Sequence, residues 1–246
     1  MTREVFTTPE ELADAVARRL LGTIASHQQT SPGRPFQLSL TGGTIASEVY
    51  RRLPQMAGHS SDGAAAGTDV DWSGVELWWS DERWVPADSS DRNAEPVLDL
   101  MAALPFGAVH PMPDAAPGVD LRAAAAAHAA ELGDTVWDLC LLGMGPDGHV
   151  ASLFPGHRSA REGITNAGPQ RVIAVDDSPK PPPQRLSVTM PVINASTEIW
   201  LLVSGAEKAE ALAGAIAGDP HLPASQVAGR EATRWFCDRA AAGQNQ

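Results

Sequence analysis

Asp147 and His149 are the residues of this sequence whose types and spacing best suit acid–base chemistry. Asp147 lies in a glycine-rich turn, Gly143–Gly148, which directly follows the apolar run Trp137–Leu142, and His149 is the next residue after that turn. Such a run is typical of a strand that is buried on both faces of a parallel sheet. Ligands of open α/β sheets bind beyond the carboxyl ends of the strands. A carboxylate and an imidazole at this place therefore indicate a general acid/base pair, although an ordinary polar turn has the same composition.

A second polar turn has the layout of an anion site. Gly42, Gly43 and Thr44 follow the predicted strand 36–40 and precede a helix predicted over 45–53. This arrangement places backbone N–H groups at a helix N-terminus, where phosphate is favoured. The spacing matches neither the Walker loop nor the dinucleotide fingerprint, and a tight turn without a ligand fits the same residues.

Two further clusters follow predicted strands, and a proline-rich segment adds basic residues. Asp81 and Arg83 come after the strand 75–79, and Arg83 suits a two-pronged contact with phosphate or a surface ion pair. Lys208 lies in the first turn of the helix predicted over 206–216, where a cation opposes the helix dipole unless an anion binds nearby. The segment 176–185 presents Lys180 and Arg185, and it cannot form regular structure because of its prolines.

Predicted strands and helices alternate along the whole chain. The first helix begins at Thr8, where Glu11 completes a capping box, and residues 54–71 read as an exposed connection. We expect one α/β domain over residues 1–246, with a doubly wound, mainly parallel sheet and helices on both faces. All the polar clusters then lie at one edge of the sheet, which predicts a single site.

The composition narrows the class of protein. The 246 residues carry a formal net charge of −12, which disfavours nucleic acid and anionic lipid as partners. Two cysteines, Cys140 and Cys237, provide neither a disulfide framework nor a zinc site. The sequence has no secretory signal pattern, no apolar run of membrane-spanning length, no G-x-S-x-G and no H-E-x-x-H. We therefore expect a cytoplasmic protein without a metal or other cofactor.

Five segments resemble the 6-phosphogluconolactonase family: LSLTGGTIA, WWSDERWVP, DLCLLGMGPDGHVASLFPG, DDSPKPPPQRLSVTMPVIN and IWLLVSGAEKAEAL. The third and fourth are specific to it, and together the five span almost the whole chain. The resemblance implies a Rossmann-like fold shared with glucosamine-6-phosphate deaminase and ribose-5-phosphate isomerase. It also implies hydrolysis of 6-phospho-D-glucono-1,5-lactone to 6-phosphogluconate in the oxidative pentose phosphate pathway, without a metal. The implied ligand is a small sugar phosphate, and no obligate protein partner is implied.

Each polar cluster takes a role under this resemblance. His149 acts as the general base that activates water, and Asp147 orients either the imidazole or the substrate. The Gly143–Gly148 backbone is the candidate donor to the oxyanion. The residues expected to bind the substrate or its phosphate are Gly42, Gly43, Thr44, Asp81, Arg83, Gly145, Arg185 and Lys208.

Two alternatives stay open at this point. Glucosamine-6-phosphate deaminases also have a Gly-Gly loop and a DGH loop, but they resemble FNEP where this chain has Ser152-Leu153-Phe154-Pro155. The glutamate that partners the histidine of a deaminase is therefore absent. A non-catalytic sugar-phosphate sensor usually carries an appended DNA-binding region, and the early first α/β unit and the acidic charge disfavour one here.

Overall fold

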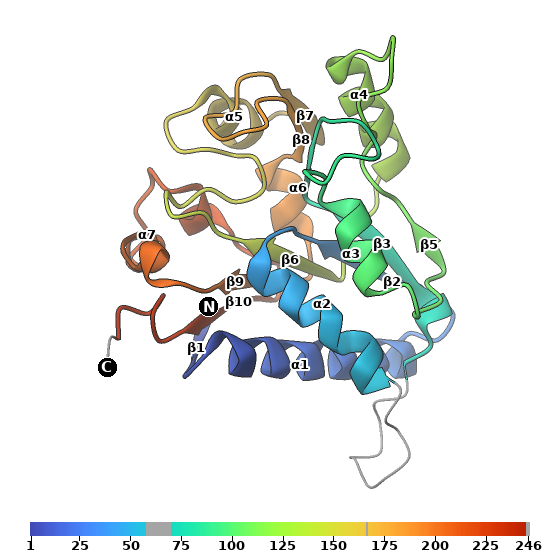
Figure 1. The fold of residues 1–246 in the computed structure, drawn as a ribbon, viewed down its shortest axis with the longest axis vertical. Helices are drawn as coiled ribbons and strands as arrows, with labels where there is room; N and C mark the ends of the chain where they lie inside the picture. Colours follow the sequence, from blue (N-terminus) through green and yellow to red (C-terminus); the bar gives the residue numbers. More distant parts are fainter. Residues whose placement is uncertain (58–69, 166, 245–246) are drawn as a thin grey trace, which may run out of the picture.

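Seven parallel strands form the central sheet of the computed structural model, which describes residues 1–57, 70–165 and 167–244 (Figure 1). Their order is β1-β10-β9-β6-β2-β3-β5, and every neighbouring pair is parallel. The strands are β1 Thr2–Phe6, β2 Phe36–Leu40, β3 Val75–Trp79, β5 Ala108–Val109, β6 Leu139–Gly143, β9 Glu198–Val203 and β10 Ala232–Asp238. The predicted doubly wound, mainly parallel sheet is confirmed.

The central strand β6 is buried on both faces, as its apolar run predicts. Leu139 and Leu141 belong to one hydrophobic core, whereas Cys140 and Leu142 belong to the other. Because successive side chains of a strand point to opposite faces, this alternation places a core on each side of the sheet.

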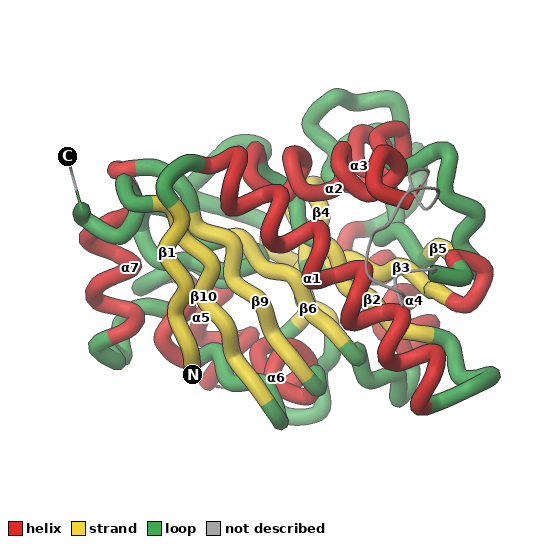
Figure 2. The backbone as a smooth tube through the Cα atoms, turned by 90° about the horizontal axis from the view of Figure 1, so that it is seen from below, coloured by secondary structure: helices red, strands yellow, loops and turns green. Residues whose placement is uncertain are grey.

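Helices cover both faces. α1, α2 and α3 share one core with the sheet, and α4, α6 and α7 share the other. Figure 2 shows α1 running across the strands of its face. The helices are α1 Pro9–Thr30, α2 Thr44–Ala57, α3 Ala94–Leu100, α4 Leu121–Leu132, α5 Arg158–Ala160, α6 Met190–Ala195 and α7 Ala209–Ile216.

The first helix begins where the capping signal predicts. The Thr8 hydroxyl accepts the N–H of Glu11 at 3.2 Å, and the Glu11 carboxylate accepts the N–H of Thr7 at 3.0 Å. The predicted end of α2 is wrong, because the helix continues through Pro54 to Ala57. The predicted connection over residues 54–71 lies mostly outside the described residues.

The structure contains a second sheet, of three strands, which the sequence analysis did not predict. β4 Asp81–Arg83 pairs antiparallel with β8 Arg185–Val188, which pairs antiparallel with β7 Val172–Val175. Residues 81–83 follow β3 as predicted, but they form a strand that the sequence analysis did not predict. The prediction that the proline-rich segment lacks regular structure as far as Arg185 is wrong for Arg185, which begins β8. The backbone of Asp81, Glu82 and Arg83 is fixed in a strand, so the direction of each side chain is set by the pleat.

The strand order reverses between β2 and β6. From β2 the chain proceeds outward through β3 to β5, and from β6 it proceeds the other way through β9 and β10. Such a reversal is the topological switch point at which α/β sheets bind ligands. The loop after β2, which leads into α2 at Thr44, and the loop after β6, which carries His149, flank it.

Candidate active site

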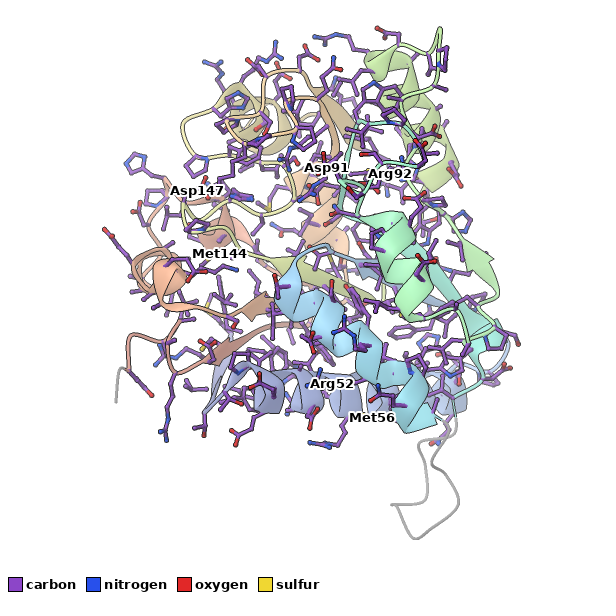
Figure 3. All side chains as sticks on the ribbon, viewed as in Figure 1. Arg52, Met56, Asp91, Arg92, Met144 and Asp147 are labelled. Atoms are coloured by element: carbon purple, nitrogen blue, oxygen red, sulfur yellow. The ribbon has the colours of Figure 1, made fainter. Side chains whose placement is uncertain are left out.

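A cavity of about 630 Å³ lies at this switch point. Its walls come from the loops after β2, β6 and β9, and from the short strands β4 and β8. Figure 3 labels Met144 and Asp147 on the loop that leaves β6, and Asp91 and Arg92 on the loop that precedes α3. The polar clusters therefore meet at one place, as the alternation of strands and helices predicts.

Nine of the ten residues that the sequence singles out line this cavity. They are Gly42, Gly43, Thr44, Asp81, Arg83, Gly145, His149, Arg185 and Lys208. The tenth, Asp147, lies behind His149 and accepts a hydrogen bond from it. Asn93 and Ser204 also line the cavity, and the sequence interpretation did not single them out.

The imidazole of His149 is held by the Asp147 carboxylate. Nδ1 of His149 lies 2.5 Å from Oδ1 of Asp147. Burial opposes ionisation of Asp147, but hydrogen bonds from His149 and Lys180 outweigh it and hold the pKa of Asp147 well below its usual range. An ionised carboxylate only accepts hydrogen bonds, so the proton lies on Nδ1 and the lone pair on Nε2.

Three glycine amides of the loop after β6 donate hydrogen bonds within the protein. Gly145 N–H donates to the His149 carbonyl at 3.0 Å, and Gly148 N–H donates to the Gly145 carbonyl at 2.9 Å. Gly143 N–H donates to the Thr41 hydroxyl at 3.2 Å. These three amides are thus engaged within the protein, and the expectation that the Gly143–Gly148 backbone donates to the oxyanion stays a prediction for its other N–H groups.

Gly145 also makes room for the acid–base pair. A Cβ at this position would lie closer than 3.0 Å to the Cε1 and Nδ1 atoms of His149, and 2.6 Å from Oδ1 of Asp147. Ala151, which follows His149 by two residues and also lines the cavity, adopts φ of 49°, which is uncommon for a residue with a side chain. Strained backbone of this kind clusters at functional sites.

The loop after β2 offers backbone donors to the cavity. Thr44 is the first residue of α2, so the first N–H groups of that helix have no partner within it. A Cβ at Gly42 would collide with the side-chain amide of Asn93, which donates to the Asp81 carbonyl at 3.1 Å. Gly42 therefore allows α2 and the β4 region to approach each other.

Three cations face the same cavity. Arg83 and Arg185 lie opposite each other on β4 and β8, and like charges in this position repel. Lys208 ends a short turn at the N-terminus of α7, and burial lowers its pKa. Among the described residues, none of these three cations forms an ion pair within 4.0 Å, so a bound anion would stabilise all of them.

Arg185 is also part of the scaffold. Its guanidinium donates to the carbonyls of Lys180, Pro181 and Pro182 at 2.9–3.1 Å, and it lies over the ring of Phe154. Arg83 keeps more of its donors for the cavity, although one of its terminal nitrogens donates to the Asp91 carbonyl at 3.0 Å.

The two carboxylates of β4 have different roles. Asp81 lines the cavity and accepts a hydrogen bond of 2.6 Å from the hydroxyl of Ser152. Glu82 is fully buried and accepts the backbone N–H groups of Arg83, Asn93 and Ala94. It thereby caps α3, because the N-cap residue Asn93 makes no capping hydrogen bond with its own side chain.

Neither a metal cluster nor a membrane-spanning helix occurs in the part of the chain that the structure describes. No group of three or more His, Cys, Asp or Glu side chains in residues 1–57, 70–165 and 167–244 is arranged to hold a metal ion. None of the described helices is both long enough and apolar enough to cross a bilayer.

Comparison with known proteins identifies the family. Residues 7–235 match the family described as glucosamine-6-phosphate isomerases/6-phosphogluconolactonase. The 6-phosphogluconolactonase of Mycobacterium tuberculosis is 40% identical over 98% of this chain and 97% of its own length. The chain belongs to this family. The resemblance stated from the sequence motifs is confirmed.

Solved structures in and around the family have the same fold. The crystal structure of a 6-phosphogluconolactonase from Thermotoga maritima is 25% identical and superposes with a TM-score of 0.75, covering 96% of this chain and 99% of the other. A monomeric glucosamine-6-phosphate deaminase gives a TM-score of 0.74 at 23% identity and covers 100% of both chains. The fold is thus common to lactonases and deaminases, and the site must distinguish them.

Proposed function

We propose that this chain hydrolyses 6-phospho-D-glucono-1,5-lactone to 6-phosphogluconate, with His149 as the general base. The observation that carries the proposal is the hydrogen bond between Nδ1 of His149 and ionised Asp147 at the wall of a cavity that three cations face. This geometry leaves Nε2 of His149 to accept a proton from water. The relatives named 6-phosphogluconolactonase support the choice of substrate.

The surroundings of His149 favour a lactonase over a deaminase. The ring of Phe154 packs against the imidazole, with the ring centroids 4.6 Å apart. Phe154 belongs to the segment in which deaminases carry the glutamate that partners their histidine. Among the described residues, Asp147 is the one carboxylate that bonds to His149.

The proposed reaction proceeds through a tetrahedral intermediate. Nε2 of His149 takes a proton from water as the water oxygen bonds to C1 of the lactone. The intermediate then collapses with cleavage of the bond between C1 and the ring oxygen, which receives that proton from the imidazolium. Asp147 stays ionised throughout and stabilises the imidazolium, as the carboxylate of a catalytic triad does.

The phosphate is expected to lie between two helix N-termini. Thr44 begins α2, and Lys208 directly precedes α7. Helix N-termini favour anions, and the ammonium of Lys208 adds a full charge. Contacts at the phosphate place C1 near His149, which converts binding energy into rate. Asp81, at the cavity wall, is suited to accept hydrogen bonds from sugar hydroxyls.

The proposed substrate is tested with freshly generated 6-phosphogluconolactone. We expect hydrolysis well above the spontaneous rate, and no release of ammonia from glucosamine 6-phosphate. Ammonia release would instead establish a deaminase. Binding of 6-phosphogluconate with turnover of neither substrate would establish a sensor.

Replacing Lys208 by alanine is expected to weaken binding of the phosphorylated lactone selectively. KM should rise by about tenfold or more, because a charge-assisted contact to phosphate contributes roughly 1.5–3 kcal/mol. The reaction of unphosphorylated glucono-1,5-lactone should change little. Steady-state kinetics with both lactones measure this difference, and equal effects on the two would remove Lys208 from the phosphate site.

The proposal also includes a cytoplasmic location and a ligand set limited to small sugar phosphates, without nucleic acid or an obligate protein partner. The formal net charge of −12 supports the exclusion of nucleic acid. These points stay predictions.

A further inference from the structure

Lys180 lies at the far end of the acid–base pair, although the sequence places it 33 residues after Asp147. Its Nζ atom lies 2.9 Å from Oδ1 of Asp147 and 3.3 Å from Nδ1 of His149. The chain contains two lysines, Lys180 and Lys208, and only Lys208 lines the cavity. Lys180 therefore contacts the acid–base pair at Oδ1 of Asp147 and Nδ1 of His149 without lining the cavity.

The loop that carries Lys180 is held by hydrogen bonds on both sides of this residue. The Ser178 hydroxyl accepts the N–H of Lys180 at 3.2 Å and donates to its carbonyl at 2.8 Å. The Arg185 guanidinium donates to the same carbonyl at 3.1 Å. The N–H of Ser178 donates to the Pro183 carbonyl at 2.8 Å, which closes the loop.

This anchoring reduces the conformational freedom that Lys180 must lose to reach Asp147. A free lysine side chain costs up to about 2 kcal/mol of rotamer entropy when it is ordered. Here the backbone is already fixed and prolines restrict the following residues, so less freedom remains to be lost. A fixed ammonium is better able to fix the carboxylate that it contacts.

The Asp147 carboxylate is the point through which Lys180 acts. Oδ1 of Asp147 accepts from both Lys180 and His149, so its position and its ionisation depend on both donors. The ammonium of Lys180 can donate hydrogen bonds but cannot accept one. Although it lies 3.3 Å from Nδ1 of His149, it therefore cannot replace Asp147 as the acceptor of the Nδ1 proton. Without Lys180, the carboxylate gains freedom to rotate, and His149 loses its fixed orientation.

We propose that Lys180 is a positioning residue of this enzyme: its ammonium fixes Asp147 so that Asp147 holds His149 with Nε2 available to water. This inference rests on the proposed role of His149 as the base. It differs from a phosphate-binding role, which the sequence left open for Lys180, and which would require the ammonium to face the cavity.

The test is the variant Lys180→Met, which keeps the length of the side chain and removes its charge. We expect kcat to fall by about tenfold to a hundredfold, the scale seen when an orienting partner or about 1 Å of placement is lost. KM should stay within about twofold, because the same ground-state contacts remain. Phosphorylated and unphosphorylated lactone should be affected equally. Lys180→Arg, which can still donate to Asp147, should recover part of the rate.

A double-mutant cycle with Asp147→Asn shows whether Lys180 acts through Asp147. In the Asp147→Asn background, Lys180→Met should cost less than about threefold, because the carboxylate that it fixes is gone. Lys208→Met is the comparison variant, and unlike Lys180→Met it should impair the reaction of the phosphorylated lactone only.

Each other result has a definite meaning. A rise in KM confined to the phosphorylated lactone would make Lys180 a phosphate ligand and overturn the inference. The inference would also be overturned if Lys180→Met lowered kcat in the Asp147→Asn enzyme by the same factor as in the wild type. An unchanged kcat in the Lys180→Met enzyme would overturn it as well. If Lys180→Met does not fold, the Lys180→Arg and Lys180→Gln variants decide in the same way, with Gln expected to lose more rate than Arg. An active His149→Ala enzyme would overturn the proposed function itself, whatever the lysine variants show.

Discussion

Replacing His149 by alanine is expected to lower kcat for 6-phosphogluconolactone by about 10²–10⁴-fold, the usual contribution of a general base. Alanine leaves the cavity without an acceptor for the proton of the attacking water, so the reaction falls back toward the spontaneous rate. The side chain of His149 is 18% exposed, donates one hydrogen bond, from Nδ1 to Asp147, and packs against the ring of Phe154. Its removal therefore breaks few contacts, and the fold should persist. The measurement is initial-rate hydrolysis, corrected for the uncatalysed reaction.

His221→Ala is the matched control for this variant. His221 is exposed on the segment that follows α7, and it does not line the cavity. Its removal should leave kcat unchanged. A His149→Ala enzyme that keeps more than about one third of the wild-type kcat would show that another group activates the water, because general-base catalysis contributes far more than threefold.

The residues that face the cavity could be located from the sequence because four of their clusters follow strands. Strand periodicity predicts β2, β3 and β9 with their observed bounds, and the carboxyl ends of parallel strands must share one edge. From this rule alone, Thr44, Arg83 and Lys208 had to lie near one another. Local sequence is sufficient to infer this shared location, because each strand and the cluster after it are recognised from residues that are adjacent in the chain.

The groups that hold the site in place could not be found in the same way. Glu82 caps α3 across 11 residues, and Lys180 reaches Asp147 across 33. Both contacts depend on the small sheet of β4, β8 and β7, in which the pairing of β4 with β8 joins segments about a hundred residues apart. No periodicity within either segment encodes the partner.

The loop after β6 also has one feature that the sequence predicts and one that it does not. Its sequence indicates a turn near a ligand, because glycine permits backbone that other residues cannot adopt. The sequence does not show which glycine is needed for its backbone conformation and which is needed because a side chain would collide with a neighbouring residue. In the structure, Gly148 adopts φ of 77°, whereas Gly145 has no positive φ and is required for the space beside His149.

Gly145→Ala is therefore expected to abolish most of the activity without touching a catalytic group. The added Cβ would lie closer than 3.0 Å to the imidazole of His149 and 2.6 Å from Oδ1 of Asp147. The ring must move, and the hydrogen bond of 2.5 Å between Asp147 and His149 cannot persist in its present form. A displacement of about 1 Å in a catalytic group costs on the order of 10²-fold in rate, so kcat should fall by that factor or more.

Gly22→Ala provides the control for a glycine substitution in the same chain. Gly22 lies within α1, and a Cβ there meets nothing within 4 Å. Alanine should stabilise that helix by roughly 0.5–1 kcal/mol and leave kcat unchanged. Thermal unfolding of the two variants separates loss of fold from loss of geometry. If Gly145→Ala remains folded and keeps near-wild-type kcat, then the loop can relax without displacing His149, and the close packing of Gly145 against the acid–base pair does not limit the reaction.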